Sequence, residues 1–361
     1  MKSLIKADDH GLILAAETLN AGGVVVIPTD TVYGLAARPD FSAAVERLYT
    51  IKQRAAKKPI ALLAADAEDA KRFLGETAAE VGSRRWPGAL TVVAHGEGVR
   101  VPDHDWTRRL LAACGGTLRV TSANMSGERP ATDAEDALAE VGLSADLVVD
   151  DGVSRGGMAS TVVEVLADGT LKILRAGPEK FLILASGSPR RAKILKAQGV
   201  DFAIMKTEIA EVAYPDDPER TVIENALAKQ GDERLFASGS VLSADTIVWY
   251  SGRIFGKPRT LEEAKEFLRT LSGKSHTVYT GVAYNGETRV VKSEVRFRRL
   301  TSVMIDNYVR RVRPLDRAGA YDIDESGDLI VESYTGSYEN IMGLPLAPLC
   351  DWQIIKDVDR K

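Results

Sequence analysis

Short apolar runs bounded by glycine, proline and polar clusters recur along the whole chain, and amphipathic segments separate them. Short runs rich in valine, isoleucine and leucine are typical of buried strands, whereas apolar residues three and four apart indicate helices. This alternation predicts an α/β (α+β) fold. The clearest predicted strands are 24–27, 60–63, 117–120, 181–184, 240–249 and 277–280, and the clearest predicted helices are 8–20, 189–198 and 302–313.

The pattern is interrupted at Gly177-Pro178, where one strand-like run ends shortly before another begins at Phe181. Proline has no N–H to donate and glycine weakens an ordered strand, so this pair indicates a boundary. The chain of 361 residues is also long for a single hydrophobic core. We therefore expect two domains, residues 1–178 and 179–361.

A candidate anion site follows the predicted strand 181–184. The segment 186–191, Ser-Gly-Ser-Pro-Arg-Arg, has small residues, a proline suited to a first helical turn, and two guanidinium groups. Free N–H groups at the start of a helix bind anions, and arginine forks add charge-assisted hydrogen bonds. The segment therefore predicts a phosphate-binding loop.

Composition and charge exclude several classes of protein. The chain is 45% hydrophobic and 27% charged with a net charge of −4, which argues against broad, non-specific nucleic-acid binding. Cys114 and Cys350 are isolated from each other, so neither a zinc ribbon nor a disulfide framework is expected. The chain shows no signal peptide and no apolar run long enough to span a membrane, and we expect a cytoplasmic location.

Polar clusters in the first half suggest ligand-binding loops. Residues 29–35 place hydroxyl groups, a carboxylate and a phenol after a predicted strand, where open α/β sheets tend to hold ligands. Lys52, Arg54 and residues 57–58 form a basic stretch, and residues 121–127 form a Ser/Asn-rich turn. Each cluster also has an ordinary explanation, as a polar turn or as a basic helix end that complements the dipole.

Taken in order, these motifs make the first half resemble the YrdC/Sua5 family of threonylcarbamoyl-AMP synthases. The matching residues are PTDTVYGL at 28–35, Lys52 with Arg54, WPG at 86–88, RVP at 100–102, TSANMSG at 121–127, STVV at 160–163 and LRAG at 174–177. The resemblance implies a twisted mixed sheet with a concave basic site. It also implies synthesis of L-threonylcarbamoyl-AMP from L-threonine, bicarbonate and ATP for the t6A modification, with transfer proteins and tRNA as indirect partners.

The resemblance assigns roles to particular residues. The residues that would hold ATP are Lys52, Arg54, Ser122, Asn124 and Arg175, and those that would hold threonine are Thr31, Arg100 and Ser160. The segment after Lys58 lacks a histidine that some members carry. The reaction brings a carbamate to an α-phosphate, so cations and a magnesium ion are the main catalytic device, and no protein nucleophile is needed.

In the second half, Asp245 is a carboxylate inside the apolar run 240–249. Burying it is costly unless it is hydrogen-bonded, metal-bound or functional, and we favour a function. Lys229 adds a cation in a helix, where it could equally be a solvated surface charge, and Lys257 adds a cation at a turn. His276 alone is more typical of a structural histidine than of a ligand.

The second half resembles the Maf family of nucleotide pyrophosphatases. The matching motifs are SGSPRR at 186–191, ADT at 244–246, GKP at 256–258, LSGKSH at 271–276, RAGAY at 317–321 and GSYENIMGLP at 336–345. The resemblance implies hydrolysis of a nucleoside triphosphate to the monophosphate and pyrophosphate, with a divalent metal such as Mg²⁺ or Mn²⁺. Asp245 would be the general base, and Glu211 with Asp245 would bind the metal. The implied phosphate-binding residues are Ser186, Arg190, Arg191, Lys229 and Lys257.

The resemblance leaves the nucleotide open. Arg190 and Thr246 are similar to members that act on dTTP and UTP, but those members usually carry glutamine where this chain has Asp324. An acidic residue at this position resembles members that act on 7-methyl-GTP. A carboxylate only accepts hydrogen bonds whereas an amide also donates, so the preferred base edge should differ. We expect a pyrimidine or a modified nucleotide.

The sequence as a whole predicts a bifunctional enzyme, and leaves its oligomeric state open, a homodimer included. One alternative is an RNA-binding first half, against which the acidic net charge counts. A second is a non-catalytic Maf-like regulator of septum formation, and a third is a generic NTPase without dependence on threonine. A hydrogenase-maturation carbamoyltransferase has a similar first domain, but its zinc-finger cysteines are missing here.

Overall fold

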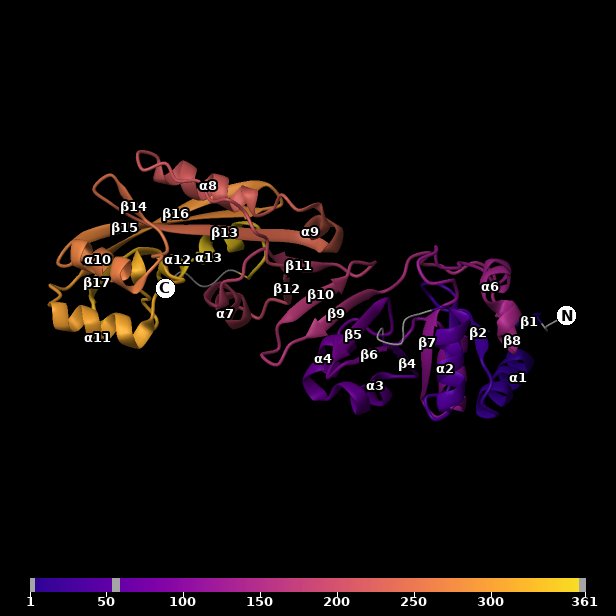
Figure 1. Cartoon of the computed structure of the whole chain (residues 1–361). Coiled ribbons are helices and arrows are strands. Elements are labelled where there is room, and N and C mark those ends of the chain that lie inside the picture. Colours follow the sequence, from indigo (N-terminus) through magenta and orange to yellow (C-terminus); the bar gives the residue numbers. More distant parts are fainter. Residues whose placement is uncertain (1–3, 54–58, 357–361) are drawn as a thin grey trace. The chain divides into compact units, whose positions relative to one another are not determined.

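The computed structural model describes residues 4–53 and 59–356. The chain divides into two compact units, Met1–Lys180 and Phe181–Lys361. Both units combine helices with mixed strands, which confirms the predicted α/β class (Figure 1). Arg54, which the sequence assigns to ATP, lies outside the described residues.

The first unit is built on a mixed sheet with the strand order β1-β8-β2-β3-β7-β4-β6-β5-β9-β10. Pairs β1/β8, β8/β2, β4/β6 and β5/β9 are parallel, and the other neighbours in this order are antiparallel. The strands are β1 Leu4–Lys6, β2 Val25–Ile27, β3 Gly34–Ala37, β4 Leu62–Ala64, β5 Leu90–Ala94, β6 Glu97–Arg100, β7 Thr117–Ser122, β8 Leu147–Asp150, β9 Thr161–Val165 and β10 Leu171–Arg175.

Helices cover both faces of this sheet. They are α1 Asp9–Asn20, α2 Ser42–Ile51, α3 Ala67–Leu74, α4 Glu76–Ser83, α5 Asp105–Ala113, α6 Ala134–Glu140 and the 3₁₀ turn η1 Gly142–Ser144. Alternate residues of the run 24–27, which includes β2, belong to two hydrophobic clusters. Val24 and Val26 pack with α2 and α6, and Val25 and Ile27 pack with α1 and α5. A strand buried on both faces is apolar throughout, which is why the run 24–27 was recognisable in the sequence.

The second unit has a sheet in the order β12-β11-β13-β15-β16-β17. β12 and β11 are parallel to β13, and β15, β16 and β17 follow as antiparallel neighbours. The strands are β11 Phe181–Leu184, β12 Phe202–Ile204, β13 Gly239–Tyr250, β14 Arg253–Phe255, β15 Ser275–Tyr284, β16 Glu287–Phe297 and β17 Val331–Thr335.

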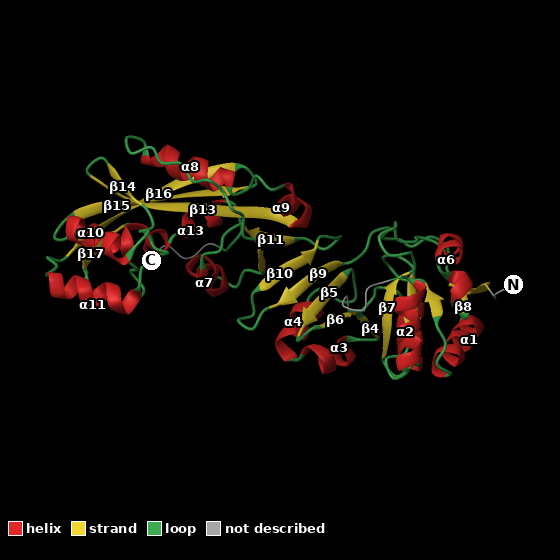
Figure 2. Ribbon diagram, in the orientation of Figure 1, coloured by secondary structure: helices red, strands yellow, loops and turns green. Residues whose placement is uncertain are grey.

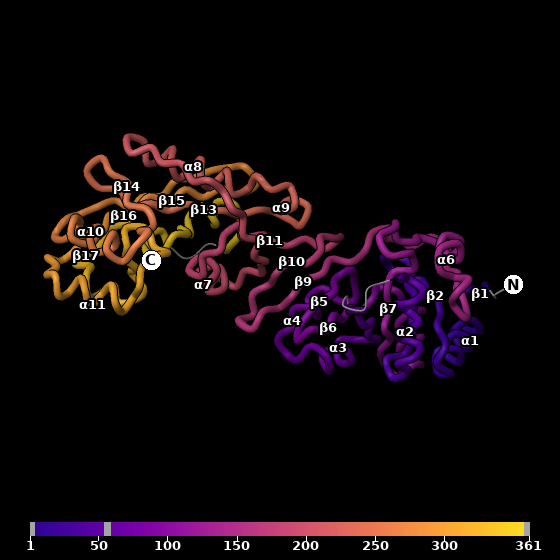
Figure 3. Tube along the Cα trace, in the orientation of Figure 1, coloured from indigo at the N-terminus to yellow at the C-terminus, as the bar shows by residue number. Residues whose placement is uncertain are grey.

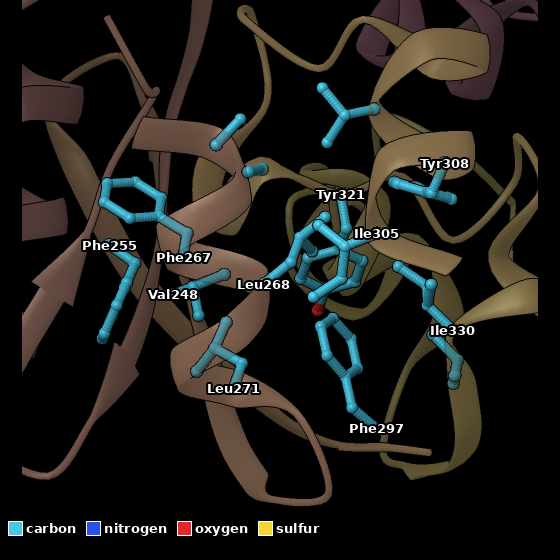
Figure 4. Close-up of a cluster of buried hydrophobic side chains, with 14 of the residues drawn as sticks. Val248, Phe255, Phe267, Leu268, Leu271, Phe297, Ile305, Tyr308, Tyr321 and Ile330 are labelled. Atoms are coloured by element: carbon cyan, nitrogen blue, oxygen red, sulfur yellow. The ribbon is translucent and has the colours of Figure 1, made fainter. Parts of the chain in front are cut away.

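Within this unit, α8 lies on one face of the sheet, and α10 and α11 lie on the other (Figure 2). The helices are α7 Pro189–Ala197, α8 Pro218–Ala228, α9 Glu233–Ser238, α10 Leu261–Leu271, α11 Ser302–Val312, α12 Tyr338–Met342 and α13 Leu346–Asp351, with 3₁₀ turns η2 Ala318–Ala320 and η3 Gly327–Leu329. A cluster around Phe267, Phe297 and Tyr321 joins α10 and α11 to the strands (Figure 4).

A gap in the edge of β13 determines where the site of this unit forms. On one edge of β13, β11 pairs with residues 239–242 and β14 with residues 248–250, whereas β15 pairs along the opposite edge. Within the described part of the chain, residues 243–247 have no strand partner on the first edge. Asp245 and Thr246 lie in this gap, and because successive side chains alternate, they point to opposite faces of the sheet.

Most predicted elements are confirmed to within a few residues. The predicted helix 189–198 is α7, the predicted strand 240–249 is β13, and the predicted helix 8–20 is α1, which Asp8 caps by accepting from Gly11 N. One boundary differs. The loop predicted over 29–35 ends earlier, because Gly34 already pairs with Ile27 and Ser122 in the sheet.

Candidate functional sites

A cavity of about 1140 Å³ opens at the gap in β13 of the second unit. All the phosphate-binding, metal-binding and catalytic residues predicted for this unit line it: Ser186, Arg190, Arg191, Glu211, Lys229, Asp245 and Lys257. Thr246 also lines the cavity, whereas Asp324 is not among its lining residues. Segments far apart in the sequence are therefore brought to one cavity, and of these predicted residues Asp324 alone is not among those that line it.

Arg191 is the most buried cation of this cavity, with 9% of the residue exposed. Its guanidinium donates to Ser186 Oγ at 2.9 Å, to the Gly343 carbonyl at 2.8 Å and to Thr246 Oγ1 at 3.1 Å. All three acceptors are neutral, and burial lowers the pKa of Arg191 to about 10. A buried guanidinium without a carboxylate on it favours an anionic ligand beside it.

The start of α7 supplies further donors to the same place. The helix begins after Ser188 with proline in its first turn, and no side chain of the described residues caps it. Uncapped N–H groups at a helix start carry partial positive charge toward the cavity side of the loop. The segment 186–191 thus joins helix amides and a buried arginine, and its binding of phosphate stays a prediction.

Asp245 is buried in the middle of β13 with 5% of the residue exposed. Its Oδ1 accepts from Lys229 Nζ at 2.6 Å, and its Oδ2 accepts from Asn225 Nδ2 at 3.0 Å. Glu211 Oε1 lies 3.3 Å from the same Lys229 Nζ and 4.0 Å from Lys257 Nζ. The structure therefore groups two carboxylates and two ammonium groups, with Lys229 between the carboxylates.

The two carboxylates fit a divalent cation of the kind that binds with a nucleotide. Mg²⁺ is usually held by one or two carboxylates together with substrate phosphates and water. Across residues 4–53 and 59–356, no three His, Cys, Asp or Glu side chains gather closely enough to hold a metal alone. Glu211 and Asp245 would hold such an ion with phosphate oxygens as the remaining ligands.

Asp322 and Asp324 lie two residues apart in the sequence but have different surroundings. Asp322 lines the cavity, and its Oδ2 accepts from Arg317 Nε at 2.8 Å and from Arg190 Nη1 at 3.4 Å. Asp324 instead pairs with Lys193 Nζ at 2.6 Å on the surface. The sequence singled out Asp324 and missed Asp322, because nothing in the run of acidic residues distinguishes the one whose side chain is buried.

His276 lies in the core behind the cavity, with 3% of the residue exposed. Its Nε2 is 3.1 Å from Tyr321 Oη, and its ring packs edge-on against Phe297 and Tyr321. Burial lowers its pKa to about 4, so the imidazole is neutral at ordinary pH. These surroundings are those of a structural histidine, as the sequence suggested.

In the first unit, Lys52 is buried against the loop that follows β7. Its ammonium donates to the Asn124 carbonyl at 2.5 Å, to Asn124 Oδ1 at 3.0 Å and to the Ser122 carbonyl. Three residues that the sequence assigns to ATP are therefore in contact. The same contacts give Lys52 a structural role, because they hold the loop after β7 in place.

Arg100 joins the polar loop after β2 to the end of β6. Its Nη1 donates to Asp30 Oδ1 at 3.0 Å and its Nη2 to Thr29 Oγ1 at 3.3 Å, and Thr29 Oγ1 lies 3.0 Å from Thr31 Oγ1. Burial lowers the pKa of Arg100, while Asp30 opposes that shift. Two of the residues assigned to threonine, Thr31 and Arg100, thus belong to one hydrogen-bonded group, in which Asp30 already neutralises the cation.

Ser160 and Arg175 meet at the neighbouring sheet edge. Arg175 Nη2 donates to the Ser160 carbonyl at 2.8 Å and to Ser160 Oγ at 3.1 Å, and Ser160 Oγ lies 2.8 Å from Thr91 Oγ1. β5 and β9 begin at this edge, and β6, which carries Arg100, ends there. A residue assigned to ATP and one assigned to threonine are therefore neighbours.

Within the described residues, no helix has the length and apolar character needed to cross a membrane.

Comparison with known proteins separates the two units. A family model described as "Maf-like protein" matches residues 181–353, and the Sua5_yciO_yrdC model, described as "Telomere recombination", matches residues 17–177. A dTTP/UTP pyrophosphatase of Thermotoga maritima is 41% identical over 185 residues, which cover 48% of this chain and 87% of that protein. A protein of the same name from Bacillus cereus is 44% identical over 177 residues, covering 47% of this chain and 92% of its own.

For the first unit, the solved structure of P. abyssi Sua5 complexed with L-threonine is similar at 27% identity and a TM-score of 0.47. The match covers 55% of this chain and 60% of that one. Both resemblances seen in the sequence are confirmed by the family models. The chain belongs to the Maf family through its second unit and is a fusion of that unit with a Sua5/YrdC unit.

Proposed function

We propose that the second unit hydrolyses a nucleoside triphosphate of the dTTP or UTP type, or a modified nucleotide, to the monophosphate and pyrophosphate. The observation that carries this proposal is Arg191, a buried guanidinium whose three hydrogen-bond acceptors are all neutral. It lines one cavity with the uncapped start of α7 and with the Asp245–Lys229 pair. A triphosphate supplies the negative charge that this arrangement favours.

In this proposal each side chain has a separate task. Ser186 and Arg191 hold phosphate oxygens at the start of α7, and Lys229 and Lys257 neutralise the charge of the leaving pyrophosphate. Asp245 accepts the proton of a water molecule that attacks the α-phosphorus, while Asn225 and Lys229 fix the direction of its carboxylate. A bound divalent cation would neutralise phosphate charge and make the water more acidic.

The test of this activity is a nucleotide panel with Mg²⁺ or Mn²⁺, with products identified by mass spectrometry. We expect a pyrimidine or methylated nucleoside triphosphate to give its monophosphate and pyrophosphate. Asp245→Asn, which keeps the shape of the side chain but removes the base, should lower kcat by about 10²- to 10⁴-fold. Unchanged hydrolysis in this variant would exclude Asp245 as the base, and no hydrolysis by the wild type would favour the non-catalytic Maf-like regulator.

We propose that the first unit makes L-threonylcarbamoyl-AMP from L-threonine, bicarbonate and ATP. The supporting observation is two buried polar groups of this unit, Lys52 with Ser122 and Asn124, and Arg100 with Thr29 and Thr31. One group offers a fixed cation and small polar residues for a nucleotide, and the other offers hydroxyl groups and a guanidinium for an amino acid. Product passed to transfer proteins would then serve tRNA modification.

The same panel tests this second activity when L-threonine and bicarbonate are added or left out. We expect ATP to give threonylcarbamoyl-AMP only when both are present, and Asp245→Asn to leave this product unchanged. ATP conversion that ignores threonine would favour a generic NTPase. Salt-sensitive binding of RNA without any threonine-dependent product would favour an RNA-binding first unit.

A further inference from the structure

The segment 205–217 joins β12 to α8, whose place in the chain trace is labelled in Figure 3. Residues of this segment line one part of the cavity, Glu211 among them. It has no helix or strand of its own among the described residues. A segment without internal ladder hydrogen bonds keeps its position only through contacts with its neighbours. The position of Glu211 relative to Asp245 therefore depends on what anchors this segment.

The anchors lie on one face of α8, four residues apart. Thr221, Asn225 and Lys229 share that face because residues at i and i+4 are neighbours on a helix. Tyr214 N donates to Thr221 Oγ1 at 2.8 Å near the start of α8, and Thr207 Oγ1 donates to the Lys229 carbonyl at 3.0 Å at its end. The segment 205–217 thus runs antiparallel to α8.

The middle anchor, Asn225, binds both backbone groups of Val212 and also touches the carboxylate of Asp245, which Lys229 contacts as well. Asn225 Oδ1 accepts from Val212 N at 2.8 Å, and Asn225 Nδ2 donates to the Val212 carbonyl at 3.0 Å. The same Nδ2 donates to Asp245 Oδ2 at 3.0 Å. Both hydrogens of the amide are used, and 3% of the residue is exposed.

We propose that Asn225 is a positioning residue that clamps the segment 205–217 against Asp245 and so keeps Glu211 and Asp245 in one site. Val212, which Asn225 binds through both backbone groups, directly follows Glu211. Releasing Val212 frees the backbone beside Glu211, and losing the third hydrogen bond frees the Asp245 carboxylate to turn. The part of this proposal that concerns activity rests on the proposed pyrophosphatase function.

The test is Asn225→Leu, with Gln230→Leu as the matched control. Gln230 follows α8 closely, has 6% of the residue exposed, and makes three hydrogen bonds, to Val241, Ala283 and Gly286. None of these partners lines the cavity. Both variants remove one buried amide and three hydrogen bonds, so both should lower thermal stability similarly.

Two measurements separate the clamp from a general loss of stability. In Asn225→Leu we expect trypsin at Lys206 and a glutamate-specific protease at Glu208 and Glu211 to cleave about tenfold faster or more, because the segment opens locally. We also expect kcat/KM for the nucleotide to fall by about 10- to 100-fold, as for other residues that support metal ligands. Gln230→Leu should resemble the wild type in both measurements.

Asn225→Asp provides the same test if the leucine variant does not fold. It keeps the acceptor for Val212 N but loses both donations, so activity should fall while cleavage rises less than in Asn225→Leu. Cleavage and activity equal to those of Gln230→Leu would overturn the proposal. If the wild type hydrolyses no nucleotide but Asn225→Leu is cleaved faster, the clamp stands and the proposed function fails.

Discussion

Arg100 of the first unit and Arg191 of the second are both buried guanidinium groups, with 5% and 9% of the residue exposed. They differ in what they contact. Arg100 pairs with the carboxylate of Asp30, whereas the acceptors of Arg191 among residues 4–53 and 59–356 are two hydroxyl groups and a carbonyl. The first cation is neutralised within the fold, and the second is left for a ligand.

The difference indicates how each unit would receive an anion. An anionic ligand at Arg100 has to compete with Asp30, which suits a small amino-acid substrate whose own ammonium group can meet that carboxylate. An anionic ligand at Arg191 meets no competing carboxylate in direct contact, which suits a triphosphate.

The largest expected effect comes from replacing each arginine with methionine. Arg100→Met leaves Asp30 buried opposite an apolar side chain, and should lower the free energy of unfolding of the first unit by about 3–5 kcal/mol. Arg191→Met removes a buried charge that has no carboxylate partner, so the stability of the second unit should change far less. Urea titrations read by hydrogen exchange measure each unit separately. Equal losses in the two variants would show that the two surroundings are equivalent.

The second prediction concerns acid stability. The folded pKa of His276, about 4, lies below the usual value of 6.5, so the unfolded chain binds a proton in this range and the folded chain does not. The contribution of the neutral His276 to the free energy of unfolding is complete above pH 6.5. It is lost as the pH falls toward 4, which lowers the free energy of unfolding of the second unit by about 3 kcal/mol. Urea titrations across this range should show the slope in the wild type, and His276→Gln should lack it.

The third prediction concerns the binding of a polyphosphate that carries no nucleobase. Tripolyphosphate should raise the melting temperature of the second unit, with a stabilisation of about 2.7 kcal/mol at a concentration 100 times Kd. Arg191→Met should abolish most of this shift because it removes the central donor. A differential scanning calorimetry series with sulfate as the control anion measures it. A shift that persists in Arg191→Met would mean that other cations hold the phosphates.

The smallest effect is expected for Asp324→Asn. Its pair with Lys193 is exposed, and such pairs contribute about 1 kcal/mol or less. The ratio of kcat/KM values for UTP and 7-methyl-GTP should therefore change by about fivefold or less. Lys193→Gln breaks the same pair and serves as the control. A change of base preference in Asp324→Asn that Lys193→Gln lacks would give Asp324 the specificity role that the family resemblance implies.

The sequence was informative where local pattern and chemistry coincide. The apolar run around Asp245 predicted both a strand and an unusual buried carboxylate, and the loop before α7 combined a turn signal with two arginines. These features depend on neighbours along the chain. The roles assigned to the individual site residues stay predictions until they are tested by mutation.

The features that the sequence did not reveal depend on contacts between distant segments. The Arg100–Asp30 pair joins the end of β6 to the loop after β2, and Asn225 gains its positioning role only because the segment before α8 folds back along that helix. Asp322 and Asp324 are two residues apart in one acidic run, yet only the first has its side chain buried. The charge and spacing of the two residues do not determine which carboxylate is buried. The buried one is Asp322, whose carboxylate accepts a hydrogen bond from Arg317.

The gap in β13 has a consequence for how this family can vary in length. Asp245 contacts α8 and Thr246 contacts Arg191 of α7 only because the strand presents them to opposite faces. Deleting or inserting one residue between the start of β13 and Asp245 would exchange the two faces and send the carboxylate toward α7. Length changes should therefore be excluded from this part of the strand, and tolerated better at the exposed turn 251–252 between β13 and β14.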